Sequence, residues 1–105
     1  MSPLEAASRN GDHGIDILAY DEKADVIWAI QCKCYRPDRK LGPRIVRELL
    51  GSLQSLPTGA RGMIVTTSTF TTGALEEAEK HSVKTINGAE FTALLRVQAS
   101  RSKGG

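Results

Sequence analysis

Three polar side chains stand inside otherwise apolar segments of this 105-residue chain: Asp16, Gln31 and Lys33. Asp16 interrupts GIDILAY at 14–20, and Gln31 and Lys33 interrupt VIWAIQCKCY at 26–35. A charge in such surroundings is costly unless it has a partner. Carboxylate and amide oxygens are hard ligands, which suit Mg²⁺ or Mn²⁺ better than Zn²⁺. A lysine beside them would orient or help deprotonate an attacking water, or neutralise charge developing on a phosphorus.

Both segments are predicted strands, because the first is a short apolar run and the second is rich in β-branched and aromatic residues. The turn residues between them predict a hairpin. Around a four-residue turn, Asp21 lies opposite Val26. The same register places Asp16 opposite Gln31, on one face with Lys33. A register shifted by one residue would separate Asp16 from Gln31 and Lys33. A plain salt bridge between Asp16 and Lys33 across the hairpin would account for the two charges equally well.

Beyond the hairpin, the pattern alternates between helices and strands. Leucines and a valine at helical spacing predict an amphipathic helix, and short β-branched runs predict buried strands. The resulting fold class is α/β, with a mixed sheet flanked by helices and with its last two strands parallel. The predicted helices cover 45–56, 71–80 and a segment beginning at 87–88, and the predicted strands cover 63–67 and 83–86. The second helix has a threonine cap and turns Ala74, Leu75 and Ala78 inward.

The bulk composition indicates one domain over residues 1–105, with 1–10 and 98–105 flexible. A net charge of +2 argues neither for nor against nucleic acid as a partner. No apolar run is long enough to span a membrane, and the first residues do not resemble a signal peptide. Cys32 and Cys34 lack a second Cys or His pair at zinc spacing, so we expect reduced, buried thiols in a cytoplasmic protein.

Five phrases along the chain, in this order, carry a family resemblance: GDHGIDILA, IQCK, VRELLG, GMIVTTSTFTTGALEEA and INGAEFTALL. Together they resemble the Mrr-type restriction endonuclease domain, a branch of the PD-(D/E)XK nuclease superfamily. The resemblance spans roughly residues 11–95. An aspartate followed by QxK would be weak alone, but the ordered set of phrases is specific.

The resemblance implies a restriction-endonuclease-like fold and a metal-dependent DNA endonuclease. Asp16 matches the metal-binding aspartate, Gln31 the position that is glutamate in most relatives, and Lys33 the catalytic lysine. Asp12 matches a position in the glycine-rich segment that precedes the metal-binding aspartate. The implied cofactor is Mg²⁺, with Mn²⁺ as a substitute, held by Asp16, Gln31 and the backbone carbonyl of Cys32.

The start of the chain departs from the family pattern. Such domains are usually preceded by a helix bearing a glutamate and by a further strand, whereas only about ten residues precede the motif here. Glu5 is a candidate for that carboxylate, although it stands too close to the motif for a full helix and strand. The departure puts activity in doubt and favours a homodimer, or a partner chain that completes the sheet.

A basic stretch directly follows the proposed site and contains Arg36, Arg39, Lys40 and Arg44. Its position favours contacts to DNA phosphates, and the alternative is a solvated loop and helix face.

Three functions are compatible with these features of the sequence: an endonuclease, a DNA-binding module with the nuclease fold but no activity, and a dimeric interaction protein. Metal-dependent cleavage that requires Asp16 would single out the first.

Overall fold

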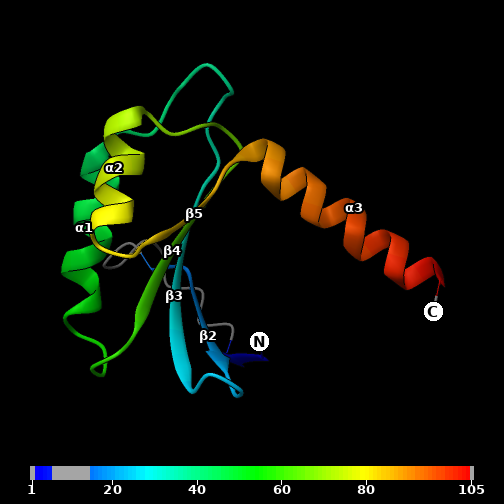
Figure 1. Ribbon diagram of the computed structural model, residues 1–105, viewed down its shortest axis with the longest axis horizontal. Helices are drawn as coiled ribbons and strands as arrows, with labels where there is room; N and C mark the ends of the chain where they lie inside the picture. Colours follow the sequence, from blue (N-terminus) through cyan, green and yellow to red (C-terminus); the bar gives the residue numbers. More distant parts are fainter. Residues whose placement is uncertain (1, 6–14, 105) are drawn as a thin grey trace.

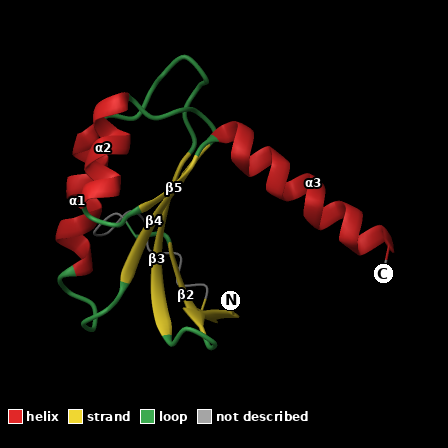
Figure 2. Cartoon of the chain, viewed as in Figure 1, coloured by secondary structure: helices red, strands yellow, loops and turns green. Residues whose placement is uncertain are grey.

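A computed structural model of the chain describes residues 2–5 and 15–104, with side chains over 15–97. These residues form a five-stranded sheet of order β1-β2-β3-β4-β5, and α1 and α2 lie together on one side of it (Figures 1 and 2). Helix α3 extends away on the other side. This arrangement confirms the predicted α/β class. The elements are β1 Ser2–Glu5, β2 Ile17–Asp21, β3 Val26–Lys33, α1 Pro43–Leu53, β4 Arg61–Thr66, α2 Thr72–Lys80, β5 Lys84–Ile86 and α3 Gly88–Gly104.

Strands β2 and β3 form the predicted hairpin in the predicted register. They pair antiparallel from Asp21 opposite Val26 to Ile17 opposite Ile30. The Asp21 carboxylate accepts hydrogen bonds from two backbone N–H groups within the turn, at 3.1 and 3.3 Å. Asp25 closes the turn with a φ of 55°, a left-handed conformation that aspartate tolerates better than most residues.

Strands β3, β4 and β5 run parallel, which confirms the prediction for the two strands joined by α2. The β3–β4 ladder runs from Trp28 opposite Arg61 to Lys33 opposite Thr66. Because neighbouring parallel strands end at the same edge of a sheet, the polar end of β3 lies beside the segment that follows β4.

The main core lies between the sheet and the first two helices. It is a cluster of buried residues formed by Leu41, Val46, Leu49, Ile64, Ala78 and Val83. Helix α1 starts with Pro43 in its first turn, where its missing N–H costs nothing. The Thr71 side chain caps α2 as predicted, by accepting a hydrogen bond from the Ala74 N–H. Leu75 does not face inward as predicted and is 46% exposed.

Regular elements occur at both ends of the chain, within the segments that were expected to be flexible. Ser2–Glu5 is a strand, β1, which pairs antiparallel with β2 and so adds an outer strand beyond the hairpin. Helix α3 continues to Gly104, past the point where a structureless tail was expected. Within the described residues, no helix has the length and apolar character needed to cross a membrane.

The cysteines are free, as predicted, but both are exposed rather than buried. On β3 the buried residues are Ala29 and Gln31, whose face is covered by the first helices, while Cys32 lies on the opposite face. The prediction of buried thiols therefore assigned the covered face to the wrong side of β3. Partial burial of Cys32 still raises the pKa of its thiol, and the charges of Asp16 and Cys34 raise it further.

Candidate active site

Asp16 stands just before β2, where the chain leaves the regular ladder. Its backbone N–H donates to the carbonyl of Ile30 at 3.0 Å, one step out of the hairpin register. Its carboxylate Oδ2 accepts a hydrogen bond from the backbone N–H of Cys32 at 2.8 Å. In a regular ladder this N–H would bond to a strand carbonyl, so the carboxylate takes the place of a backbone acceptor. Asp16 therefore lies against β3 between Gln31 and Lys33.

Gln31 is almost completely buried, with 3% of its surface exposed. It pairs with Ile64 on β4, so its side chain points to the face covered by α1. Its Oε1 atom is buried and has no hydrogen-bond partner among the described residues. An unpartnered buried oxygen costs about 1–3 kcal/mol, so its presence calls for an explanation. A ligand that binds to this oxygen is one such explanation.

Lys33 is the last residue of β3 and is half-buried. The ion pairs of the described residues join other groups, and none connects Lys33 with Asp16. The alternative of an Asp16–Lys33 salt bridge across the hairpin is therefore not what this structure forms. The ammonium instead lines a pocket of about 290 Å³.

This pocket, called the basic pocket below, lies between the loop after β3 and the start of α1. Its cations are Lys33, Arg39, Lys40 and Arg44, and Glu48 is the one carboxylate in its lining. Three of the four predicted DNA contacts thus gather around the lysine of the QxK motif. The fourth predicted contact, Arg36, is not in the lining; its guanidinium lies 3.4 Å from the Asp38 carboxylate, and both side chains are exposed.

Two contacts organise the side chains of the basic pocket. The Arg39 guanidinium stacks over the Tyr35 ring, 4.3 Å from its centroid. Arg44 Nε lies 3.2 Å from Glu48 Oε2 on the next turn of α1. Both contacts are too exposed to add much stability. They do limit where the two guanidinium groups can go.

Other predicted site residues fall partly or wholly outside the described part of the chain. Asp12 lies in the undescribed segment 6–14. Glu5 pairs with Leu18 on β2, two residues from Asp16, but only its backbone is described. Among residues 15–97 no cluster of three or more His, Cys, Asp or Glu side chains could hold a metal ion. A metal here would rely on Asp16, an amide oxygen and backbone groups.

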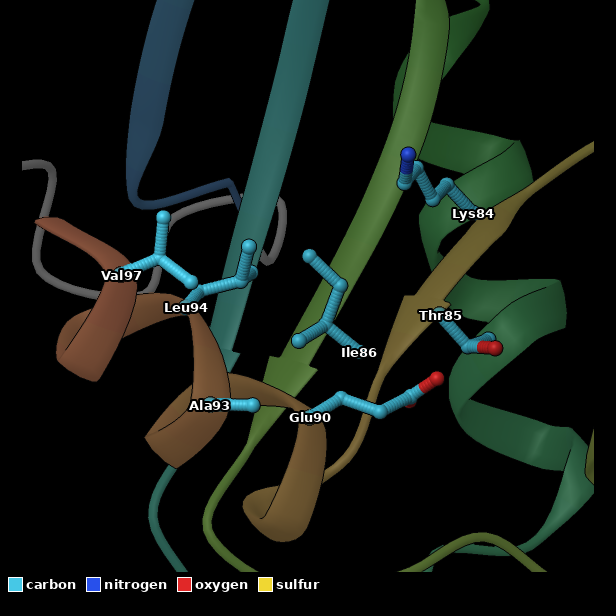
Figure 3. Close-up of a pocket in the computed structure, with 7 residues that line it drawn as sticks. All are labelled: Lys84, Thr85, Ile86, Glu90, Ala93, Leu94 and Val97. Atoms are coloured by element: carbon cyan, nitrogen blue, oxygen red, sulfur yellow. The ribbon is translucent and has the colours of Figure 1, made fainter.

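A second pocket of about 360 Å³ lies between β5 and α3 and contains none of the predicted site residues (Figure 3). Figure 3 shows Ile86 of β5 facing Leu94 and Val97 of α3 across it. Lys84 and Glu90 contribute the charges of its lining. The pocket is mainly apolar, which fits a gap beneath an incompletely packed helix better than a site for phosphate chemistry.

The sheet, the hairpin aspartate and the QxK end of β3 define a nuclease domain of the restriction-endonuclease class. A family model described as a restriction endonuclease, the Mrr catalytic domain, matches residues 2–95. The chain therefore belongs to the Mrr-type restriction endonuclease family.

Solved structures agree with this assignment. The chain is similar to the MspJI restriction endonuclease in complex with a 27-mer oligonucleotide, with a TM-score of 0.64 and 31% identity over 85% of this chain. It shares its fold with the DNA modification-dependent restriction endonuclease AspBHI (TM-score 0.63, 24% identity, 78% of this chain). It also shares it with a repair endonuclease from Pyrococcus abyssi (TM-score 0.52, 23% identity, 70% of this chain).

A curated relative is an uncharacterized mitochondrial protein of Schizosaccharomyces pombe, 33% identical over 76 residues, or 70% of this chain. The match covers 31% of that protein. The matches cover 21% of the MspJI chain, 21% of AspBHI and 31% of the Pyrococcus chain. The chain thus spans less than a third of the length of each of these relatives.

Proposed function

We propose that this chain is a metal-dependent DNA endonuclease domain that hydrolyses phosphodiester bonds with Asp16, Gln31 and Lys33. One observation carries the proposal: the buried Gln31 Oε1 has no protein partner among the described residues, and the Asp16 carboxylate lies against the next residue of β3. Two hard oxygen donors at neighbouring positions fit a divalent cation such as Mg²⁺ or Mn²⁺. The backbone carbonyl of Cys32 is the proposed third protein ligand.

The bound ion would supply a Lewis acid for the phosphodiester and would lower the pKa of a bound water. The protein's own part is to hold the reacting groups. The hydrogen bond from the Cys32 N–H keeps one Asp16 oxygen in place, so the carboxylate is oriented before any ligand binds. Burial keeps the Gln31 amide dry, which strengthens its interaction with a cation.

Lys33 is proposed to neutralise the charge that develops on the phosphorane oxygens. Its ammonium is half-buried and has no carboxylate partner among the described ion pairs, so its charge is available to the substrate. The other cations of the basic pocket would hold neighbouring phosphates and set the position of the scissile one. Because backbone contacts carry no sequence information, target choice would come from outside this domain.

The first experiment is nicking of supercoiled plasmid by the purified chain in Mg²⁺, in Mn²⁺ and in EDTA. Asp16→Ala and Lys33→Ala should each lower the rate at least about a hundredfold, because they remove charge stabilisation at the reacting centre. Glu79→Ala and Lys80→Ala are matched controls, because they make the same charge changes at exposed positions of α2. Cleavage that persists in EDTA, or in both site variants, would refute the proposal.

A second candidate is a DNA-binding module that does not cleave. The observation in its favour is that no group of three or more His, Cys, Asp or Glu side chains among the described residues could hold a metal ion. Retention of DNA that weakens with salt, without nicking in either metal, would select this candidate.

We also propose that residues 1–105 act as one domain that associates with a second copy or another chain. Support comes from α3, whose Leu94, Leu95 and Val97 are each about half exposed. Light scattering of the eluted protein tests the homodimer directly. Leu94→Glu should convert a dimer to a monomer, and a monomeric parent protein would leave another chain as the partner. The free thiols fit a reducing compartment such as the cytoplasm.

A further inference from the structure

Three hydroxyl side chains lie at the end of β4 and just after it: Thr66, Thr67 and Ser68, called the hydroxyl triplet below. All three donate to carbonyl groups at the end of β3 or in the loop that leaves it, residues 34–41, called the basic loop. Thr66 Oγ1 donates to the carbonyl of Lys33 at 2.6 Å, where the loop begins. Thr67 Oγ1 donates to the carbonyl of Tyr35 at 2.8 Å.

Ser68 continues the pattern further along the basic loop. Its Oγ lies 2.6 Å from the carbonyl oxygen of Arg39 and 3.3 Å from that of Pro37. The backbone completes the attachment, because the Leu41 N–H donates to the Thr69 carbonyl at 2.9 Å. The backbone is thus held at alternate residues from Lys33, just before the loop, to Leu41, its last residue.

The hydroxyls supply donors to a loop that has no regular strand partner. Carbonyl groups outside a ladder must take their donors from side chains, other backbone groups or water. Thr66 and Ser68 are each 2% exposed, so water does not reach their hydroxyls to compete. Side chains that donate to alternate carbonyls stabilise one backbone conformation of a loop that could otherwise adopt many.

The conformation stabilised in this way determines where the cations stand. Arg39 and Lys40 are in the basic loop and line the basic pocket together with Lys33. The Arg39 carbonyl is held by Ser68 while its guanidinium stacks on Tyr35, whose carbonyl is held by Thr67. The hydroxyl triplet therefore fixes the backbone of both residues in the stacked pair, Tyr35 and Arg39.

We propose that Thr66, Thr67 and Ser68 are positioning residues for DNA, which hold the basic loop so that its cations meet successive phosphates beside Lys33. This inference rests on the proposed function, since it assigns the basic pocket to the DNA backbone. In this role the hydroxyl triplet does not contact DNA itself and acts only through its hydrogen bonds to backbone carbonyls. Preorganised cations lose less entropy on binding than mobile ones.

The test compares Thr67→Val, which removes the hydroxyl at constant shape, with Thr67→Ser, which keeps it. Thr67 is exposed, so neither change opens a cavity in the core. Binding of a labelled duplex is followed by fluorescence anisotropy in EDTA across a range of salt concentrations. Thr67→Val should weaken binding about three- to tenfold and lower the salt slope by about one. Thr67→Ser should bind within about twofold of the parent protein.

Thr69→Val is the matched control, because Thr69 is exposed in the same segment and its side chain donates to no carbonyl of the basic loop. It should bind DNA like the parent protein. Parent-like binding by Thr67→Val would overturn the proposal, and so would equal losses in Thr67→Val and Thr67→Ser.

Amide hydrogen exchange separates this proposal from the proposed function, because it needs no DNA. In Thr67→Val, exchange should become faster over residues 34–41 and stay unchanged in the β2–β3 hairpin. Unchanged exchange in the basic loop would overturn the positioning role, whether or not the parent protein binds DNA. Faster exchange with unchanged DNA binding would also overturn it. A parent protein that neither binds DNA nor nicks it in Mg²⁺ or Mn²⁺ would refute the proposed function, and the positioning role would fall with it.

Discussion

The two faces of the sheet differ in how completely they are covered. On the face beneath α1 and α2, Ala29 and Ile64 are fully buried against residues such as Leu49 of α1, and even the polar Gln31 is only 3% exposed. On the face toward α3, Ile17 is 38% exposed and Cys32 is exposed. Figure 1 shows the reason: two helices pack along the first face, while α3 projects away from the second. The candidate catalytic side chain Gln31 belongs to the better-packed face.

Each face of the sheet has a feature that costs free energy, and the two features are of different kinds. The covered face contains a buried amide oxygen without a protein partner, which is a local cost at a proposed site. The open face exposes apolar side chains, which is a cost spread over a surface and is relieved by any chain that covers it. The first therefore points to a ligand, and the second to a neighbouring chain.

The largest expected difference between the two faces comes from truncating one leucine on each side of the sheet, Leu49 of α1 and Leu94 of α3. Leu49→Ala removes a fully buried side chain and should lower the free energy of unfolding by about 3 kcal/mol. Leu94→Ala removes a side chain that is 53% exposed and should cost less than about 1 kcal/mol. Urea denaturation at low protein concentration measures both. Equal losses would mean that α3 is packed as firmly as α1.

Two glycines provide the next largest contrast. A Cβ on Gly88 would lie 2.3 Å from the Thr67 carbonyl oxygen, so Gly88→Ala must displace backbone and should cost about 2 kcal/mol. Gly51 in α1 has nothing within 4 Å of the added carbon, so Gly51→Ala should raise stability by about 0.5–1 kcal/mol. Thermal denaturation decides the signs. A neutral Gly88→Ala variant would show that the start of α3 shifts freely.

Removing the buried amide should have a smaller effect on stability, of opposite sign to the core truncation. Gln31→Met keeps the length of the side chain and removes the unpartnered oxygen, so the free energy of unfolding should rise by about 1 kcal/mol. Nicking activity should be lost in the same variant, because a proposed metal ligand is gone. Chemical denaturation with and without Mn²⁺ is the measurement. A destabilised variant would indicate that the amide is already satisfied in solution.

The smallest expected effect distinguishes the two thiols. The pKa of Cys32 is raised, chiefly by burial, so a smaller fraction of it is thiolate near neutral pH. Iodoacetamide should therefore modify Cys34 severalfold faster than Cys32, and the two rates should converge in urea. Mass spectrometry of the alkylated peptides measures each rate. Faster reaction at Cys32 would contradict the assigned burial.

Much of the fold and site could be predicted because the signals were local. Alternation in VIWAIQCKCY and a four-residue turn were enough for the hairpin register, and helical spacing identified α1 with Val46 and Leu49 inward. The QxK phrase pointed to Gln31 and Lys33, which stay proposed site residues. The strand Ser2–Glu5 was missed, because SPLE has little strand propensity and pairs only through contact with β2.

The sequence by itself determined the order of elements, the hairpin register and the family, because propensity, periodicity and motif spacing are properties of neighbouring residues. Only the tertiary structure decided which face of β3 is covered, because that depends on where α1 and α2 pack. It also decided that Thr66, Thr67 and Ser68 hold the basic loop, which lies about thirty residues earlier in the chain. Their hydroxyls have loop carbonyls as partners because parallel β3 and β4 end side by side.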